Sequence, residues 1–250
     1  MKSPFTGKEM KVVKETREMT FRKETFPVVF HYYICEDTNE QFEDEHFSAL
    51  NYSQVLNQYR VKHHIPFPEQ IKEIRLKYDL SATKMSEILG MGANSWRIYE
   101  GDEVPSKAHA NLIQMIGKPE NFEEYIQKYS ELEDKQRDKI LRHVQKLKTD
   151  TCYCTDQLYR FNCQPDIFTG FKAFDREKTK QVILFYAENQ NPYKTKMNKL
   201  LFYSDFVHFR NTAQGITGLK YAALPHGPVP NYYEYLFEAL VEEGLIAKEY

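Results

Sequence analysis

The sequence predicts an α+β protein that is mostly helical, with a small β-rich N-terminal ribbon and helical regions after it. Polar and apolar residues alternate over the first fifty residues, as in the segment from Phe26 to Ile34, which is typical of short strands. Beyond residue 66, apolar residues recur at intervals of three and four between glycine and proline breaks, which indicates helices. We divide the chain into a β-rich domain at 1–50, a helical bundle at 66–118, a helical linker at 119–174 and an α-rich domain at 175–250.

The composition is typical of soluble globular proteins, because 41% of the residues are hydrophobic and 14% are aromatic. No apolar run approaches the roughly 20 residues that cross a bilayer, and the N-terminus lacks the apolar core of a signal peptide. We therefore expect a cytoplasmic protein with no membrane partner. A net charge of -2 gives no overall basic surface, so binding to nucleic acid would depend on local residues.

The four cysteines are Cys35, Cys152, Cys154 and Cys163, and no pair has C-x-x-C spacing. A reducing compartment disfavours disulfides, so we interpret all four as free thiols. The alternative is a metal site that combines Cys152, Cys154 and Cys163, but these three have no clear fourth ligand. We expect no metal and no cofactor.

The segment from residue 69 to residue 116 predicts a series of short helices. The Ser81 hydroxyl is placed to cap a helix at 82–89, and two glycines then introduce a turn. A further helix follows at 94–100, and the pair Pro105-Ser106 is expected to cap the next one. This order and spacing predict a helix-turn-helix bundle that projects one helix into the major groove of DNA.

The predicted recognition helix has an inward and an outward side. Trp96 and Tyr99 are expected to pack inward, whereas asparagine and arginine suit the edges of adenine and guanine. The residues expected to contact DNA, at bases or phosphates, are Ser81, Thr83, Lys84, Asn94, Ser95 and Arg97. The alternative is that these are ordinary polar residues on the solvated face of a helical bundle.

The run L-S-x-x-x-M-S-E-I-L-G, followed by N-S-W-R-I-Y-E-G and then V-P-S, resembles the Xre-type repressor family. That resemblance implies binding to operator DNA. Acidic and basic residues nearly balance between Glu69 and Lys107. Affinity would therefore depend on dimerisation and on basic residues elsewhere, such as Arg60, Lys62 or the face from Arg137 to Lys148.

Two N-terminal segments, Met1 to Gly7 and Ile34 to Glu40, resemble the two knuckles of the zinc domain of MqsA-type antitoxins. Each knuckle of that family is a C-x-x-C, but here Ser3, Thr6 and Thr38 replace three of the cysteines and only Cys35 remains. Neutral hydroxyls are poor zinc ligands, so we expect a ribbon without zinc. The residues expected to stabilise it by packing are Phe5, Val13, Phe21, Phe30, Tyr32 and Phe42. The alternative is an accidental likeness in a short β-rich segment.

The resemblance to MqsA-type antitoxins also implies which residues contact DNA bases. Asn94 matches the asparagine with which the MqsA-like family reads DNA. The reading arginine of that family falls on Ile98 here, with Arg97 one residue earlier. The base specificity of the family therefore does not carry over intact.

Beyond the bundle, apolar residues from Phe122 to Leu147 predict one helix with a basic second half. The last segment contains three helical candidates, at Val182 to Ala187, Leu200 to Phe209 and Tyr232 to Leu245. We expect the following residues of this segment to be mostly core: Leu200, Leu201, Tyr203, Phe206 and Phe209.

Three ordered motifs, at 196–206, 215–221 and 226–230, resemble the Panacea, or SocA-like, domain. Members of that family neutralise protein toxins by direct binding, and some deliver a toxin to a protease. The family's domain usually continues further than Tyr250, so we expect an incomplete domain here. The aromatic-rich candidates for toxin binding are Tyr221, His226, Tyr232, Tyr233 and Tyr235. The alternative for about half of this set is core packing.

The leading hypothesis is an antitoxin that forms a homodimer, represses its own operon and captures a toxin. The first alternative is a stand-alone transcriptional regulator whose C-terminal domain senses another partner or ligand. The second is an enzyme that uses Asp205, His208 and His226. No activated nucleophile, metal cluster or phosphate-binding glycine loop accompanies these three residues, so we assign no catalytic residue and expect no enzyme. The segment His226-Gly227-Pro228 is expected to form a rigid turn.

Overall fold

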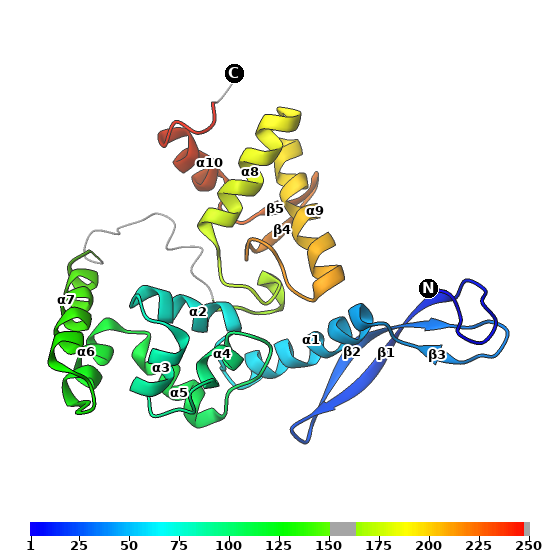
Figure 1. Ribbon diagram of the computed structural model, residues 1–250. Coiled ribbons are helices and arrows are strands. Elements are labelled where there is room, and N and C mark those ends of the chain that lie inside the picture. The colour runs from blue at the N-terminus through cyan, green and yellow to red at the C-terminus, as the bar shows by residue number, and fades with distance from the viewer. Residues whose placement is uncertain (151–163, 248–250) are drawn as a thin grey trace. The chain divides into compact units, whose positions relative to one another are not determined.

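The structure is a computed structural model that describes residues 1–150 and 164–247 (Figure 1). Cys152, Cys154 and Cys163 lie outside the described residues. The chain divides into two compact units, which are described separately. The first contains Met1–Val61 together with Gln157–Tyr250, and the second contains Lys62–Asp156. The protein has the expected α+β fold, in which helices predominate beside a small N-terminal antiparallel sheet.

The N-terminal sheet is built on a long hairpin. Strands β1 (Lys11–Phe21) and β2 (Glu24–Ile34) pair along their whole length, and the short β3 (Gln41–Phe42) joins the end of β2. The turn residues Arg22 and Lys23 have positive φ angles of 47° and 68°, the backbone that a tight hairpin turn requires. The alternation of the first fifty residues therefore predicted these strands correctly.

Helix α1 (Glu45–Lys62) satisfies backbone groups of β2 that β3 leaves unpaired. The Asn51 amide accepts a hydrogen bond from the His31 N–H at 2.8 Å and donates to the His31 carbonyl at 2.9 Å. The Gln54 amide bonds to Val29 in the same way, with both distances at 2.9 Å. These side chains act as a substitute strand, which keeps the edge of β2 from remaining unsatisfied.

The second unit is a helical bundle. Its elements are α2 (Pro68–Lys77), α3 (Ala82–Ile88), α4 (Ser95–Tyr99), α5 (Lys107–Ile116), α6 (Pro119–Lys128) and α7 (Asp134–Asp150). Ser81 caps α3 and Ser106 caps α5 through side-chain hydrogen bonds, as the sequence predicted. One apolar cluster connects these helices and includes the fully buried Ile71, Trp96 and Val144.

The single helix expected from Phe122 to Leu147 was wrong, because the chain forms two helices there. Helix α6 ends at Lys128 and α7 begins at Asp134. Leu132 lies in the break and is buried, so the apolar periodicity continues through a segment that is not helical. The Arg137 guanidinium bonds the carbonyls of Tyr129 and Leu132 at 2.9 and 3.3 Å, which satisfies groups that the break exposes.

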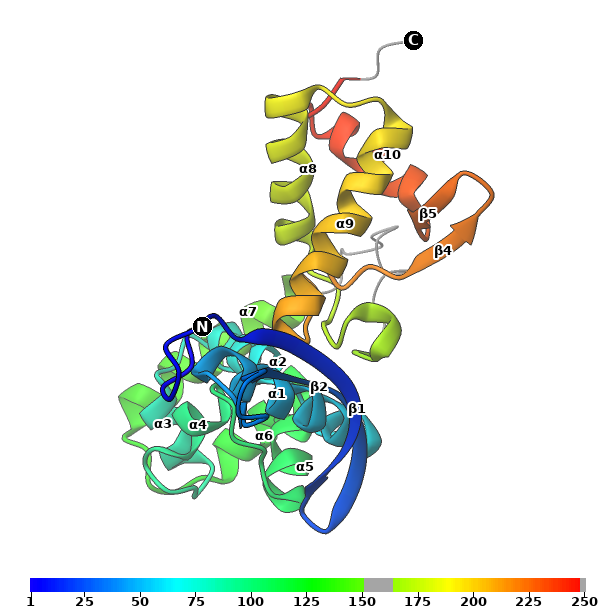
Figure 2. The ribbon, with the colours of Figure 1, turned by 90° about the vertical axis from the view of Figure 1, so that its right-hand side faces the viewer.

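The C-terminal part of the first unit combines three helices with a second hairpin (Figures 1 and 2). In chain order it contains the 3-10 turn η3 (Ile167–Thr169), α8 (Arg176–Gln190), α9 (Lys194–Thr212), β4 (Tyr221–Leu224), β5 (Gly227–Pro230) and α10 (Tyr233–Glu242). Figure 2 shows α8 and α9 side by side, with the hairpin beside α9. Ile183, Leu201 and Leu236 belong to the core that joins the three helices.

A close backbone approach fixes the connection that leads into this hairpin. Gly218 has a φ of +73°, and a Cβ atom at this position would lie 2.4 Å from the Ala173 carbonyl oxygen. A side chain is therefore excluded both by conformation and by space. This requirement explains why the motif at residues 215–221 contains a glycine at position 218.

Two of the expected core residues of α9 are on the surface. Leu201 is fully buried, but the side chains of Tyr203 and Phe206 are 61% and 50% exposed. Phe5 is likewise 66% exposed, although its ring lies 5.9 Å from that of Phe42.

Within residues 1–150 and 164–247, no helix has both the length and the apolar composition that crossing a membrane requires.

Candidate functional sites

The joint between α3 and α4 is built around a buried tryptophan. Trp96 has no exposed surface, and its backbone N–H donates to the Ser86 hydroxyl of α3 at 3.0 Å. Its indole N–H donates to Glu100, just after α4, at 2.8 Å. Tyr99 is half-buried, and its hydroxyl lies 2.7 Å from Nδ1 of His109. The expected inward packing of Trp96 and Tyr99 is thus confirmed, and it fixes the position of the five-residue helix α4.

Arg75 of α2 binds Glu100, the residue that follows α4. Its guanidinium reaches both carboxylate oxygens of Glu100, with 2.9 Å between Nη2 and Oε2, and it also donates to the Leu80 carbonyl at 2.9 Å. Both side chains are only 15% exposed. The pKa of Arg75 is raised above its ordinary value, first by the hydrogen bond to Glu100. Paired charges with this degree of burial are sensitive to removal of one partner.

The six candidate DNA-contacting residues differ in their local surroundings. The Ser81 hydroxyl accepts the Lys84 N–H at 3.1 Å as a helix cap, and the Lys84 ammonium lies 3.2 Å from the Glu87 carboxylate. Thr83, Asn94 and Arg97 are exposed, and Ser95 is half-buried at the start of α4.

The outward side of α4 contains one residue that the sequence reasoning did not assign to DNA contact. Ile98 is 50% exposed, next to Arg97. An apolar side chain at this place can contact a thymine methyl group but cannot donate a hydrogen bond to guanine. The sequence carries no clear signal for its exposure, because Trp96 and Tyr99 of the same five-residue helix are also apolar and pack inward.

The four N-terminal positions that correspond to knuckle cysteines meet in space. The Thr6 Oγ1 atom lies 3.7 Å from the Cys35 sulfur, and the side chains of Ser3 and Thr38 also interact with this sulfur. The hydrogen bonds from Ser3 and Thr38 are the main cause that lowers the pKa of Cys35 to about 6. Cys35 is a buried free thiol. These contacts suit a thiolate held by hydroxyl donors, a different chemistry from the four N or S ligands of structural zinc.

Asp205 is a buried structural centre of the C-terminal part. Its Oδ1 atom accepts the backbone N–H groups of Ile216 and Thr217 at 2.7 and 2.8 Å. Its Oδ2 atom accepts the hydroxyls of Thr217 and Tyr221 at 2.5 and 2.6 Å. Burial of the Tyr221 hydroxyl, followed by the charge of Asp205, raises the pKa of Tyr221 well above its ordinary value. The carboxylate connects α9 to the segment that leads into the hairpin.

The residues of the alternative enzyme site do not form a hydrogen-bonded group. His208 Nδ1 lies 2.7 Å from the Gln214 carbonyl oxygen, and His226 is exposed in the hairpin turn between β4 and β5. Within the described residues, Asp205 has no hydrogen bond to either histidine. Of the expected turn His226-Gly227-Pro228, only His226 lies in the hairpin connection, whereas Gly227 and Pro228 belong to β5 and pair with Leu224 and Ala223.

The five candidate toxin-binding residues fall into two groups. Tyr232 and Tyr235 are 50% and 36% exposed, with ring centroids 6.5 Å apart, and His226 is also exposed. Tyr233 instead packs against the core between the C-terminal helices, and Tyr221 is held by Asp205. The accessible part of the predicted set is therefore His226, Tyr232 and Tyr235.

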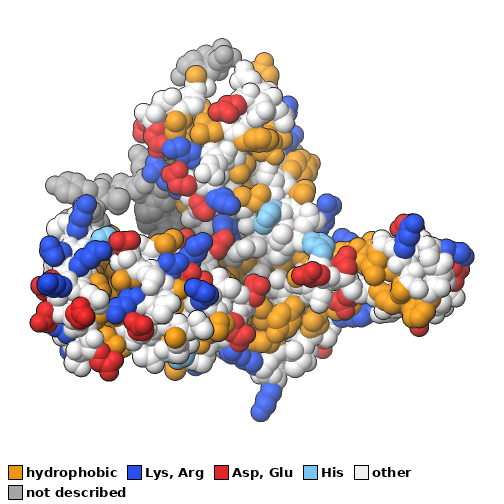
Figure 3. Space-filling model, in the orientation of Figure 1, with side chains coloured by type: hydrophobic (Ala, Val, Ile, Leu, Met, Phe, Trp, Pro, Cys, Tyr) orange, Lys and Arg blue, Asp and Glu red, His pale blue; other side chains and the backbone are white. Residues whose placement is uncertain are grey.

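Exposed apolar side chains also lie on α8 and α9. We define the α8–α9 apolar face as Phe185, Tyr203, Phe206 and Val207, whose side chains are 59%, 61%, 50% and 47% exposed. The Phe202 ring packs against this face. Its centroid lies 4.0 Å from that of the Phe206 ring and 5.4 Å from that of the Tyr221 ring. Figure 3 shows hydrophobic side chains over α8 and α9 on the face in view. Sequence reasoning missed this face, because it assigned Tyr203 and Phe206 to the core.

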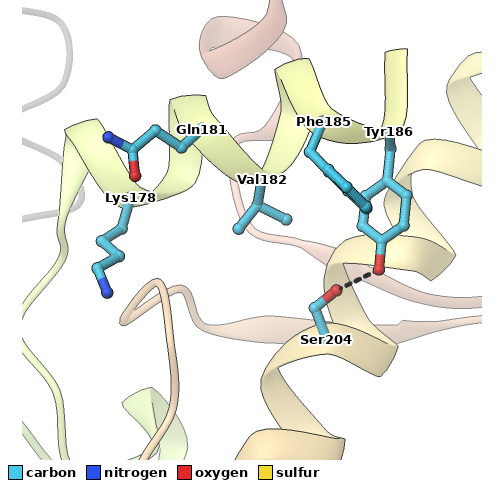
Figure 4. A pocket seen from close by; sticks show the side chains of 6 residues that line it. All are labelled: Lys178, Gln181, Val182, Phe185, Tyr186 and Ser204. Atoms are coloured by element: carbon cyan, nitrogen blue, oxygen red, sulfur yellow. Dashed lines mark hydrogen bonds between the residues drawn. The ribbon is translucent and has the colours of Figure 1, made fainter. Parts of the chain in front are cut away.

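A shallow groove adjoins this face (Figure 4). Its volume is about 210 Å³, and its lining residues are Lys178, Gln181, Val182, Phe185, Tyr186 and Ser204. The Tyr186 hydroxyl lies 2.8 Å from the Ser204 hydroxyl, which connects α8 to α9 at one end of the groove. Drug-sized ligands occupy pockets of about 300–1,000 Å³, so this groove has the size for a single large side chain.

Comparison with known families gives one match. The model of a family described as "Antitoxin SocA-like, Panacea domain" matches residues 197–249. This range covers most of α9, the β4–β5 hairpin and α10. No curated protein matches the chain. The resemblance of the C-terminal region to an antitoxin domain, expected from three motifs, is thereby confirmed.

Proposed function

We propose that this protein is an antitoxin that neutralises a protein toxin by direct binding and represses its own operon through α3 and α4. The observation that carries this proposal is the antitoxin-domain match over residues 197–249. It falls on α9, the helix that supplies Tyr203, Phe206 and Val207 of the α8–α9 apolar face. A toxin is therefore the expected partner of this region.

The chemistry of the α8–α9 apolar face supports protein binding. Contiguous exposed apolar surface on a folded domain marks a site for a partner, and aromatic residues dominate the binding energy of interfaces. Phe185 and Tyr203 are each more than half exposed and are supplied by different helices. The groove beside Phe185 would accept one anchoring side chain of the toxin, with the Lys178 ammonium at its rim.

The proposal that α4 reads DNA rests on its fixed position and its outward residues. Trp96 and the Arg75–Glu100 pair hold α4 against α2 and α3. Asn94 and Arg97 are exposed and have the side chains that pair with adenine and guanine. A single short helix provides few contacts, so we include a homodimer bound to two half-sites in the proposal.

The toxin-binding half is tested by co-purification with the protein that the adjoining reading frame encodes. The double variant Phe185→Ser, Tyr203→Ser should weaken capture by roughly tenfold or more, because two anchors of the α8–α9 apolar face are lost. Phe168→Ser is the matched control, since Phe168 is 74% exposed on η3 in the same unit. Equal capture by the double variant and the wild-type protein would contradict this role for the face.

A second candidate function is a stand-alone regulator whose C-terminal domain senses another partner or ligand. The groove favours it, because Lys178, Tyr186 and Ser204 add polar groups to an apolar lining, as in small-molecule sites. The volume of about 210 Å³ limits such a ligand to a small one. Retained operator binding together with no binding of the adjoining gene product would favour this candidate over the antitoxin.

A further inference from the structure

Helix α7 has a line of four cationic side chains that the helix-turn-helix does not use. We define the basic stripe as Lys135, Lys139, Arg142 and Lys146, which follow one another at intervals of four, three and four residues. In an α-helix with 3.6 residues per turn, this spacing places all four on one face. All four side chains are exposed.

The opposite face of α7 is fixed in the core of the unit. Ile140 and Val144 belong to the apolar cluster that also contains Trp96 of α4. His143 Nε2 lies 2.9 Å from the Lys77 carbonyl oxygen at the end of α2. The basic stripe is therefore held on a helix that is packed into the same bundle as α3 and α4.

The basic stripe differs from the other Lys and Arg side chains of α7 in its ion pairing. Arg137 pairs with Asp134, and Lys148 pairs with Glu123 at 2.7 Å. Within the part of the chain that the structure describes, none of the four stripe residues forms an ion pair, and Arg142 only donates to the Asp138 backbone carbonyl. Asp134 and Asp138 each directly precede a lysine of the stripe in the helix sequence, so the four cations outnumber the two neighbouring carboxylates.

The dimensions of the stripe match a nucleic-acid strand. The eleven steps from Lys135 to Lys146 rise by about 16 Å along the helix axis, at ~1.5 Å per residue. The two strands of duplex DNA together carry one phosphate per ~1.7 Å of the duplex axis, so a stripe of this length meets several phosphates. Figure 3 shows Lys and Arg side chains in blue over α7.

We propose that the basic stripe of α7 binds the phosphate backbone of duplex DNA and supplies sequence-independent affinity to the bundle. This inference rests on the proposed operator binding by α4. Of the candidate contacts of α3 and α4, only Lys84 and Arg97 are cationic, and Lys84 is paired with Glu87. Operator affinity therefore needs further cations, and phosphate contacts provide most of non-specific affinity. Charge complementarity to a regular polyanion favours DNA over an acidic protein as the ligand.

The test compares the full-length wild-type protein with the quadruple variant Lys135→Gln, Lys139→Gln, Arg142→Gln, Lys146→Gln. Binding to the protein's upstream DNA and to a random-sequence duplex is measured by fluorescence anisotropy over a salt series. Each phosphate contact contributes about 0.9 to the slope of log affinity against log salt, so the slope should fall by roughly 3 to 4. The ratio of upstream to random affinity should stay unchanged, because the stripe reads no bases.

A matched control separates the stripe from net charge. The variant Lys14→Gln, Lys23→Gln, Lys196→Gln, Arg210→Gln removes the same number of exposed cations from the other unit and should keep the wild-type slope. Circular dichroism checks that both variants fold. An unchanged slope in the stripe variant, an equal fall in the control, or loss of toxin capture with DNA binding intact would overturn the proposal. Failure of α4 to read sequence would appear separately, as equal wild-type affinity for upstream and random DNA.

Discussion

Arg75 on α2 and Glu100 after α4 form an ion pair in which Nη2 of Arg75 lies 2.9 Å from Oε2 of Glu100. The same carboxylate accepts the indole N–H of Trp96 at 2.8 Å. One acidic side chain therefore connects the first helix of the bundle to both the core and the end of the candidate recognition helix. Stability of the bundle and the position of α4 depend on the same group.

Removal of the Glu100 charge should destabilise the bundle. We expect Glu100→Gln to lower the free energy of unfolding by about 1–3 kcal/mol, because Arg75 keeps its charge at 15% exposure without an anionic partner. Chemical denaturation followed by circular dichroism measures this change. Glu87→Gln is the matched control, since its pair with Lys84 is exposed and should contribute at most about 1 kcal/mol. Equal effects of the two variants would refute the special role of Glu100.

Exposed residues of α4 should determine sequence selectivity. We expect Asn94→Ala and Arg97→Ala each to weaken binding to the operator by about 1–3 kcal/mol, with little change for random DNA. Competition titrations against the two duplexes measure the ratio. Lys84→Gln is the comparison, because loss of a phosphate contact should weaken both duplexes equally. Unchanged selectivity in both alanine variants would exclude α4 as the reading helix.

The Asp205 centre should be structural. We expect Asp205→Ala to destabilise the C-terminal part by about 3 kcal/mol or more, because four donors from Ile216, Thr217 and Tyr221 would lose their acceptor. Tyr221→Phe removes one of these bonds and should cost about 1 kcal/mol. Thermal unfolding of the two variants shows which of them loses more stability. A fully stable Asp205→Ala protein would contradict this assignment and reopen a chemical role for the carboxylate.

Cys35 should make the stability of the N-terminal ribbon depend on pH. Hydrogen bonds from Ser3 and Thr38 lower its pKa from 9.0 to about 6 in the folded protein. A depressed pKa stabilises the folded state above the unfolded pKa of about 9, and this stabilisation is lost as the pH falls through about 6. We expect stability to fall with decreasing pH across this window.

The measurement compares unfolding of a protein that keeps Cys35 with that of its Cys35→Ser variant between these two pH values. The serine variant should lack the Cys35 contribution, so the difference between the two proteins should shrink as the pH decreases. Cys152, Cys154 and Cys163 are replaced by serine in both proteins, so that only one thiol titrates. A constant difference between the two proteins at all pH values would show that the Cys35 thiol is not held as a thiolate.

The fold was predictable where a local signal defines a local structure. The Ser81 and Ser106 hydroxyls marked two helix starts, and the alternation in β2 marked a strand. The break before Asp134 was not predictable, because Leu132 keeps the apolar period through a non-helical segment. The strands β4 and β5 have four residues each, too few for a periodic signal.

The candidate sites were less predictable than the fold. Tyr203 and Phe206 lie at the spacing of core residues, and periodicity does not distinguish a face buried in the molecule from one kept for a partner. The partners of Asp205 are 11 to 16 residues away in sequence, so its role depends on the tertiary structure. Residues with a distinctive chemistry, such as Asn94 and Arg97, could be named as candidates from the sequence, but which candidates are exposed depends on the tertiary structure.

The central claim, that the protein neutralises a toxin through its C-terminal domain, is tested most directly by growth of cells that express the adjoining gene product. Co-expression of the full wild-type chain should restore growth, and the Phe185→Ser, Tyr203→Ser variant should restore it poorly while Phe168→Ser restores it fully. If the adjoining product arrests growth and the wild-type chain gives no rescue, the antitoxin assignment is contradicted.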